Sequence, residues 1–179
     1  MANPIGHFKT ITKHRHRVIK HCFKAGIGAQ GLRHDLSKYS FAEFSKGAKY
    51  YDGSRSPNEL ERNDIGYSSA WLHHKGRNRH HFEYWTDYNP VEKKLMPVKM
   101  PLKYVVEMFC DRVAASKIYL KDKYTDAAPL SYFYGGKNNR FIDSETSDLL
   151  ERLLMMLKEQ GEEKTFNYIK NTLLKQKDY

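Results

Sequence analysis

The segment between residues 102 and 120 constrains the fold more than any other part of the chain. Two prolines, Pro97 and Pro101, precede it, and few of its positions are polar. A helix that is apolar on nearly all sides is normally buried by other elements. We therefore predict a central helix from about Leu102 to Leu120. Its apolar residues are Val105, Val106, Met108, Phe109, Val113, Ala114, Ala115 and Ile118.

Helical patterns also mark most of the remaining chain. Apolar residues recur with helical spacing over residues 8–25, and Gly26 and Gly28 supply an end to that helix. A capping-box sequence at Ser40 predicts a helix to about residue 50, and a proline after Ser56 predicts another up to residue 74. Residues 77–85 are predicted to form a second short helix or to continue the previous one.

The C-terminal third follows the same pattern. Residues 125–140 predict an irregular connection, residues 144–158 a helix closed by Gly161, and the following residues a last helix to about residue 175. No stretch shows strand-like alternation of useful length, and no internal repeat is present. We predict an all-α, single-domain helical bundle over residues 1–179, with the C-terminal helices at about residues 143–176.

Composition narrows the class of protein. Lys and Arg total 31 against 21 Asp and Glu, a net charge of +10, which favours an anionic partner or substrate. These basic residues are spread along the chain, so a solvated surface is favoured over a nucleic-acid-binding one. Cys22 and Cys110 form no CxxC motif, which argues against a disulfide framework or a cysteine-rich zinc module. No signal peptide or membrane-spanning stretch is evident, so we expect a cytoplasmic location.

The dipeptide His34-Asp35, with Lys38 three residues later, is the first candidate for chemistry. A neighbouring imidazole and carboxylate can supply nitrogen and oxygen ligands to one metal ion. Taken alone, such a pair is more often a capping or surface pair. His14 lies on the apolar stripe of the first helix, as does His21, whereas His16 is turned by roughly 140° from that stripe at about 100° per residue. Helix phase therefore favours His14 or His21 over His16.

Four histidines lie in the middle of the chain: His73, His74, His80 and His81. Within one helix the first and third of them, and the second and fourth, share a face but lie about 10 Å apart along the axis at 1.5 Å per residue. One metal cannot easily take both members of such a pair, whereas two metals could, as could a helix broken at Gly76. The alternative is that each packs as a core-edge residue on the neighbouring aromatic side chains. Taken together, we expect at least one of the four to bind a metal.

Asp111 falls on the apolar helix, where an ionised carboxylate costs several kcal/mol unless it is paired. Either a cation such as Arg112 or Lys103 meets it in a structural salt bridge, or a metal does. The series His14, His34-Asp35, the middle histidines and Asp111 resembles the HD-domain superfamily. In that superfamily an all-α fold gathers H, HD and D from separate helices around one or two divalent metals. The stretch HDLSK is similar to the HDxxK variant of its signature.

This resemblance implies a metal-dependent phosphohydrolase acting on an anionic phosphoester, possibly a nucleotide. The first metal ligands would be His14, His34, Asp35 and Asp111, with the middle histidines serving a second metal or the substrate. Lys38, with Arg77 or Arg79, would neutralise the phosphate. The metal would be Fe, Mn, Zn or Mg. Three alternatives stay open: a di-iron oxygenase with the same ligands, a non-catalytic nucleic-acid-binding protein, and a structural zinc site.

The chain is also similar, over approximately residues 14–135, to an uncharacterised family of bacterial and phage proteins. The similarity rests on long stretches such as HDLSKYSFAEF, GYSSAWLHHKGRNRHHFEYW and MPLKYVVEMFCDRVAASKIY. Some members of that family are labelled catalase. Haem catalases are far larger, and this chain contains none of their haem-binding motifs, so the similarity supplies a family and no activity.

Overall fold

The computed structural model describes residues 2–176 and 178–179, and in these residues the protein is mostly helical. Short 3-10 segments lie at Leu36–Tyr39, Phe82–Tyr84, Lys121–Lys123, Lys137–Asn139 and Leu173–Lys175. The α-helices and the strands are, in chain order, α1 (Pro4–Ala25), α2 (Gly28–Gly31), α3 (Phe41–Lys49), α4 (Pro57–Ile65), α5 (Ser69–Lys75), β1 (Thr86–Asn89), β2 (Lys94–Pro97), α6 (Leu102–Leu120), α7 (Ala128–Tyr134) and α8 (Ser144–Asn171).

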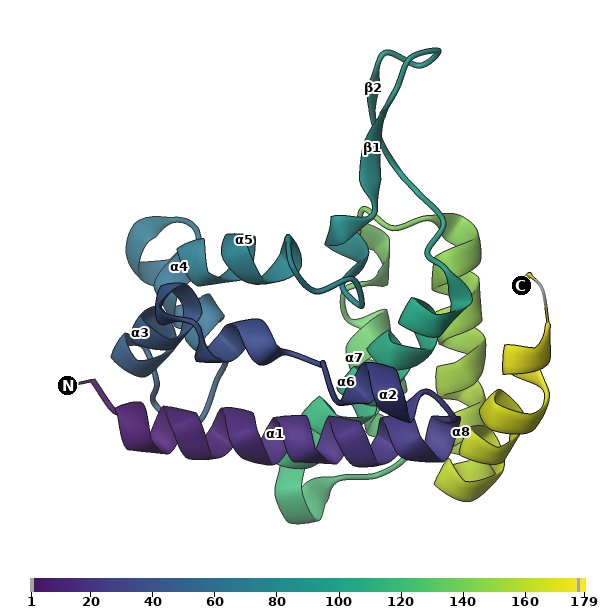
Figure 1. Ribbon diagram of the computed structural model, residues 1–179, viewed down its shortest axis with the longest axis horizontal. Helices are drawn as coiled ribbons and strands as arrows, with labels where there is room; N and C mark the ends of the chain where they lie inside the picture. Colours follow the sequence, from purple (N-terminus) through teal and green to yellow (C-terminus); the bar gives the residue numbers. More distant parts are fainter. Residues whose placement is uncertain (1, 177) are drawn as a thin grey trace.

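Helix α6 lies in the core, as its apolar sequence predicts. Val105, Val106, Phe109, Cys110 and Val113 have no exposed surface, and they pack with buried residues of α1 and α8 in one cluster. In Figure 1, α1 runs along the base of the molecule, α3 to α5 lie above its N-terminal half, and α6 to α8 lie at its other end. The two sets of helices are joined by the segments that precede α3 and follow α5.

Local signals set several helix ends. Asn3 caps α1 by accepting a hydrogen bond from the Gly6 backbone at 2.8 Å, and Gly26 ends the helix in the left-handed region at φ 86°. Gly161, at φ 80° and ψ 171°, breaks α8 at the position predicted from the sequence. The predicted start of α3 after Ser40 is confirmed, although the Ser40 side chain makes no capping hydrogen bond.

The all-α prediction was wrong in one element, because β1 and β2 form an antiparallel hairpin with Thr86 opposite Pro97. The Asn89 side chain accepts hydrogen bonds from the backbones of Val91 and Glu92 and so closes the turn. The hairpin projects away from the helices (Figure 1), and most of its residues are at least partly exposed. With no face buried in the core, its sequence carries no apolar alternation by which it could be predicted.

Three helix predictions also need correction. The helix expected up to residue 74 is divided into α4 and α5 at Gly66, which adopts a left-handed φ of 83°. Residues 77–85 are turns with one 3-10 segment, and α7 forms inside the stretch predicted to be irregular. Within the described residues, every helix is too short or too polar to cross a bilayer.

Packing around α8 provides a test of the core. Leu153 lies on α8 with no exposed surface. We expect Leu153→Ala to lower the free energy of unfolding by about 2–5 kcal/mol, because a buried leucine loses its contacts and leaves a cavity. Urea denaturation measures the loss, and Met155→Ala, at a residue of the same helix that is 41% exposed, is the control. Equal losses in the two variants would contradict this core.

Candidate metal centre

Asp35 lies at the centre of the candidate site, between α2 and the 3-10 segment Leu36–Tyr39. Its side chain is only 2% exposed, and its backbone adopts φ 54° and ψ 24°, in the left-handed region. That conformation is uncommon for a residue with a side chain, although aspartate adopts it more readily than most, and such residues cluster at functional sites. It turns the carboxylate inward, where its two oxygens face two different groups of side chains.

The first group surrounds the Oδ2 atom of Asp35. His34 Nε2 lies 3.3 Å from this oxygen and His14 Nε2 lies 4.0 Å from it. Asp111 Oδ1 completes the group, 2.9 Å from His14 Nε2 and 3.8 Å from His34 Nε2. Helix α1, the segment after α2 and helix α6 thus bring together two imidazole nitrogens and two carboxylate oxygens. This donor set suits a divalent transition metal.

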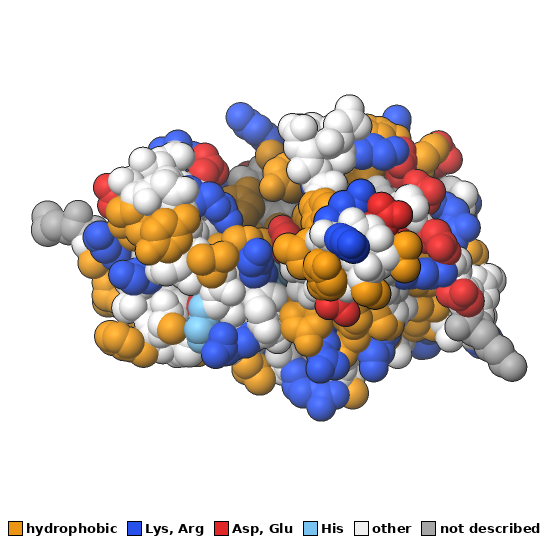
Figure 2. All heavy atoms as spheres, turned by 90° about the horizontal axis from the view of Figure 1, so that it is seen from above, with side chains coloured by type: hydrophobic (Ala, Val, Ile, Leu, Met, Phe, Trp, Pro, Cys, Tyr) orange, Lys and Arg blue, Asp and Glu red, His pale blue; other side chains and the backbone are white. Residues whose placement is uncertain are grey.

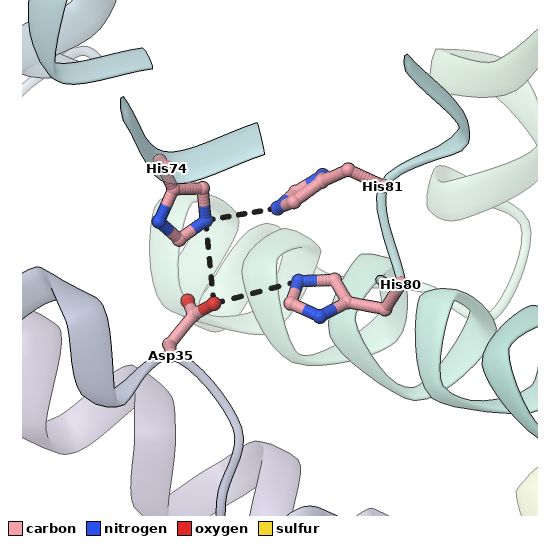
Figure 3. Close-up of side chains that lie close together, drawn as sticks. All are labelled: Asp35, His74, His80 and His81. Carbon is pink, nitrogen blue, oxygen red and sulfur yellow. Dashed lines mark hydrogen bonds and ion pairs between the residues drawn. The ribbon is translucent and has the colours of Figure 1, made fainter. Parts of the chain in front are cut away.

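The second group surrounds the other oxygen of the same carboxylate. His74 Nε2 and His80 Nε2 lie 3.3 Å and 3.4 Å from Asp35 Oδ1. His81 Nε2 lies 2.9 Å from His74 Nε2, and one ligand atom from each of the four residues falls within 4.8 Å of the others. Figure 3 shows His74 and His80 directed at Asp35, with His81 directed at His74.

Unpaired polar atoms in these groups fit a bound cation. Among the residues that the structure describes, His34 Nε2, Asp35 Oδ1 and His80 Nε2 are buried without any hydrogen-bond partner. A buried polar atom left unpaired costs on the order of 1–3 kcal/mol. A divalent cation is a ligand that would satisfy nitrogen lone pairs and carboxylate oxygens together.

Two glutamates hold the histidines from behind. Nδ1 of His34 donates to Glu107 Oε1 at 2.9 Å, and Nδ1 of His80 lies 3.2 Å from the same oxygen, so one carboxylate orients a histidine of each group. His74 Nδ1 contacts Glu43 Oε2 at 2.8 Å in the same way. A carboxylate behind the far ring nitrogen fixes the tautomer that leaves Nε2 free to bind a metal.

Sequence reasoning missed both glutamates. Glu43 was assigned to the capping box of α3, but its carboxylate faces the histidines. Glu107 was not considered, although it lies one helical turn before Asp111 on the same apolar helix and is 4% exposed. The signal that could have found it is the cost of burying a carboxylate, which applies to Glu107 as much as to Asp111.

The charged side chains of the site strongly affect one another's pKa values. Burial lowers the pKa of His34, but the adjacent charge of Asp35 and the hydrogen bond to Glu107 outweigh it and raise this pKa to about 10. Burial favours the neutral form of Asp35, yet His34 and Lys38 hold its pKa well below the ordinary range. The carboxylates are therefore ionised and require a positive charge, which protons supply in the metal-free protein and a metal can supply instead.

His14 and His81 differ from His34. Burial lowers the pKa of His14 below its usual value, although its hydrogen bond to Asp111 opposes the effect. Burial, together with the positive charges of His80 and His74, holds the pKa of His81 well below the usual range. A neutral imidazole offers a lone pair without first losing a proton, so both side chains suit metal binding.

The remaining predicted residues lie at different distances from the two groups. Lys38 is close, with its ammonium 2.6 Å from Asp35 Oδ2 and its side chain 28% exposed. His73 is not part of either group, because its Nδ1 contacts Glu43 at 2.6 Å on the outer side. Arg77 is exposed and donates to the backbone oxygen of His73, and its role near a substrate stays a prediction. His21 lies in the core, where its Nδ1 donates to the backbone oxygen of Cys110, 3.3 Å away.

The adjacent residues His73 and His74 make a matched pair for mutation. We expect His74→Gln to remove the metal of the second group, because Nε2 of His74 contacts Asp35. His73→Gln should leave metal content within about twofold of the wild type, since its ring lies on the outer side of Glu43. Elemental analysis of both purified variants checks this. Equal loss of metal from both would contradict the placement of His73.

Basic side chains do not single out the site. Figure 2 shows Lys and Arg side chains scattered over the face seen from above, with apolar and acidic side chains between them. This face therefore offers no single basic patch of the kind that follows a nucleic-acid backbone. The positive charge most closely associated with the candidate centre is that of Lys38.

Comparison with known proteins identifies one family model that matches the chain. The model of a family of unknown function, DUF5662, matches residues 3–156, which includes every residue of the two groups and both glutamates. No curated protein and no solved structure matches the chain.

Proposed function

The chain belongs to the DUF5662 family of unknown function, and from its site we propose that it is a metal-dependent phosphoester hydrolase with an HD-type centre for two divalent ions. The observation that carries the proposal is the position of Asp35, whose two oxygens face two separate groups of ligand atoms. A carboxylate in that position can bridge two ions, the arrangement used by many enzymes that displace groups at phosphorus.

The order of the residues along the chain supports an HD-domain-like arrangement. His14 comes from α1, His34-Asp35 from the segment after α2, and Asp111 from α6, with the middle histidines supplied by α5 and the turn that follows it. His14, His34, Asp35 and Asp111 would hold one ion, and Asp35 with His74, His80 and His81 the other. When bound, the two ions supply Lewis acidity for the attack of water on phosphorus.

Lys38 is the residue of this chain best placed to act on the phosphate. Burial lowers its pKa, but Asp35 and Asp111 outweigh that effect and raise it, so the ammonium stays charged. It lies at the edge of the site, partly exposed, whereas the side chains of Asp35 and His34 are at most 2% exposed. A fixed positive charge there stabilises the negative charge that develops on the phosphoryl oxygens.

The proposal is tested by assaying untagged protein, loaded with Mn²⁺, Fe²⁺ or Zn²⁺, against bis(p-nitrophenyl) phosphate, p-nitrophenyl phosphate and common nucleotides. We expect metal-dependent release of product, with kcat lowered on the order of 10²-fold in Lys38→Gln and unchanged metal content. Lys46→Gln, at an exposed lysine of α3, is the control. No hydrolysis of any of these compounds by fully metal-loaded protein would refute the assignment.

A di-iron oxygenase is the second candidate. Three imidazole nitrogens and one carboxylate oxygen in the second group form a nitrogen-rich donor set that also suits iron. The two candidates differ in their need for oxygen. Consumption of O₂ by the iron-loaded protein, with no hydrolysis under nitrogen, would favour the oxygenase, whereas hydrolysis that proceeds under nitrogen would favour the hydrolase.

A further inference from the structure

A hollow bounded by α1, α6 and α8 shares no side chain with the candidate metal centre. Its volume is about 420 Å³, within the size range of small-molecule sites. The three helices pack on one another, and in Figure 1 α6 and α8 lie at the C-terminal end of α1. The charged residues that line the hollow are Lys13, Arg17, Lys20, Lys24, Lys117 and Glu162.

Helix spacing gathers most of the positive charges of the hollow on one side of α1. Lys13, Arg17, Lys20 and Lys24 follow one another at intervals of four, three and four residues. They therefore share a face of the helix over about 16 Å, at 1.5 Å per residue. Lys117 adds a further positive charge from α6. Like charges at this spacing repel one another and destabilise a helix, so the hollow favours a bound anion.

The one carboxylate that lines the hollow does not neutralise these charges. Glu162 forms ion pairs with Lys117 and, at 3.6 Å, with Lys24. The positive charges that remain act on His21, which also lines the hollow. Burial lowers the pKa of this histidine to about 4 against its hydrogen bond to the Cys110 backbone, and the charges of several of the surrounding lysine and arginine side chains add to the effect of burial.

Arg17 is the residue of the hollow that most needs a partner. It is half-buried, yet in residues 2–176 and 178–179 its guanidinium forms no hydrogen bond and no ion pair with another protein group. Lys13 and Lys20 are exposed and also form no ion pair in that part of the chain. Polar groups withdrawn from water normally have a hydrogen-bond partner, and a guanidinium can only donate. The missing partner of Arg17 is therefore an acceptor, which an anion supplies.

The shape of the hollow favours a small polyanion over a nucleic acid. Sites that bind single-stranded nucleic acid combine a long basic groove with aromatic side chains on which the bases stack. Among the described residues, no Phe, Tyr or Trp side chain lines this hollow. A single phosphate contacts only part of a row of charges about 16 Å long. Linked phosphoryl groups contact several of these side chains at once.

We propose that this hollow binds a small polyanion that carries two or more linked phosphoryl groups. The planar fork of Arg17 holds two oxygens of one phosphoryl group, and the lysines beside it on α1 contact the next one as point charges. The site goes beyond the proposed hydrolase and does not depend on it, because none of the metal ligands or the glutamates behind them lines the hollow.

Calorimetric titration of the full-length protein with inorganic tripolyphosphate tests the proposal. Metal is first removed with a chelating resin, because a soluble chelator is itself an anion that competes. The salt concentration is about 0.15 M, at which distant surface charges are screened. We expect Arg17→Gln to weaken binding about tenfold or more, which corresponds to at least ~1.4 kcal/mol. Arg17→Lys should recover part of the affinity, because it keeps the charge and loses the fork.

The matched control is Arg152→Gln, at an exposed arginine of α8 that does not line the hollow. Circular dichroism and metal content after loading should be the same in both variants. Equal affinity of folded Arg17→Gln and Arg152→Gln for tripolyphosphate would refute the site and leave the hydrolase standing. An oligonucleotide that binds the wild type more tightly than tripolyphosphate, and loses its affinity in Arg17→Gln, would overturn the proposal in favour of a nucleic-acid site.

Discussion

Replacing Asp35 with alanine should remove both metals and with them the hydrolytic activity, a fall in kcat on the order of 10³-fold or more. Each oxygen of this carboxylate faces a different group of ligand atoms, so no other single substitution removes a ligand from both. The measurements are elemental analysis and product release with bis(p-nitrophenyl) phosphate. Metal content falls in both groups together if Asp35 is the bridge.

The matched control for Asp35→Ala is Asp148→Ala, at an exposed aspartate of α8. Circular dichroism shows whether each variant keeps its helices, because a loss of metal through unfolding would prove nothing about the bridge. A folded Asp35→Ala protein that retains the full metal content of the wild type would contradict the role given to this residue.

Replacing Glu107 with glutamine should weaken metal binding by about 10–100-fold, although Glu107 is not one of the proposed metal ligands. Its carboxylate accepts a hydrogen bond from Nδ1 of His34 and lies 3.2 Å from Nδ1 of His80, one histidine from each group. Burial favours the neutral form, but the two histidines lower the pKa of Glu107 to about 2, so it is a charged partner at neutral pH. Glutamine keeps the shape and removes the charge.

The effect of Glu107→Gln is measured by competition with a metal-sensitive dye, beside Glu159→Gln, which changes an exposed glutamate of α8. We expect both metals to bind more weakly in the first variant and neither in the second. An affinity in Glu107→Gln within about twofold of the control would show that this carboxylate does not orient the ligands.

The buried helix of the fold was predictable because its sequence is apolar on nearly every side. Helix phase also separated His14, which is buried at the site, from His16, which is exposed. Both results depend only on the angle between successive residues of one helix. The hairpin β1–β2 escaped prediction because neither face is buried, so its sequence carries no pattern.

The pairing of the middle histidines depends on a turn that local sequence does not define. A continuous helix would place His74 and His81 far apart along its axis, but α5 ends at Lys75 and the chain turns back. Asn78 holds this turn by donating to the His74 backbone at 2.8 Å and to Ser37 Oγ at 2.8 Å. The second of these contacts comes from a distant segment, which is why periodicity alone left the broken helix as one alternative among several.

Glu43 shows a further limit of prediction from the sequence. Glu43 lies three residues after Ser40 and fits a capping box, but its carboxylate is used by the histidines of α5. Its contact with His74 joins residues 31 positions apart, so no local pattern could reveal it. A site assembled from several segments becomes visible only when packing brings those segments together.

The metal centre is tested most directly by the metal content of untagged wild-type protein, purified after growth with added Mn, Fe and Zn. We expect about two ions per chain, and a spectroscopic signature of coupled ions when the metal is iron or manganese. A protein that holds no stoichiometric transition metal, even after supplementation and with its helices intact, would contradict the metal centre.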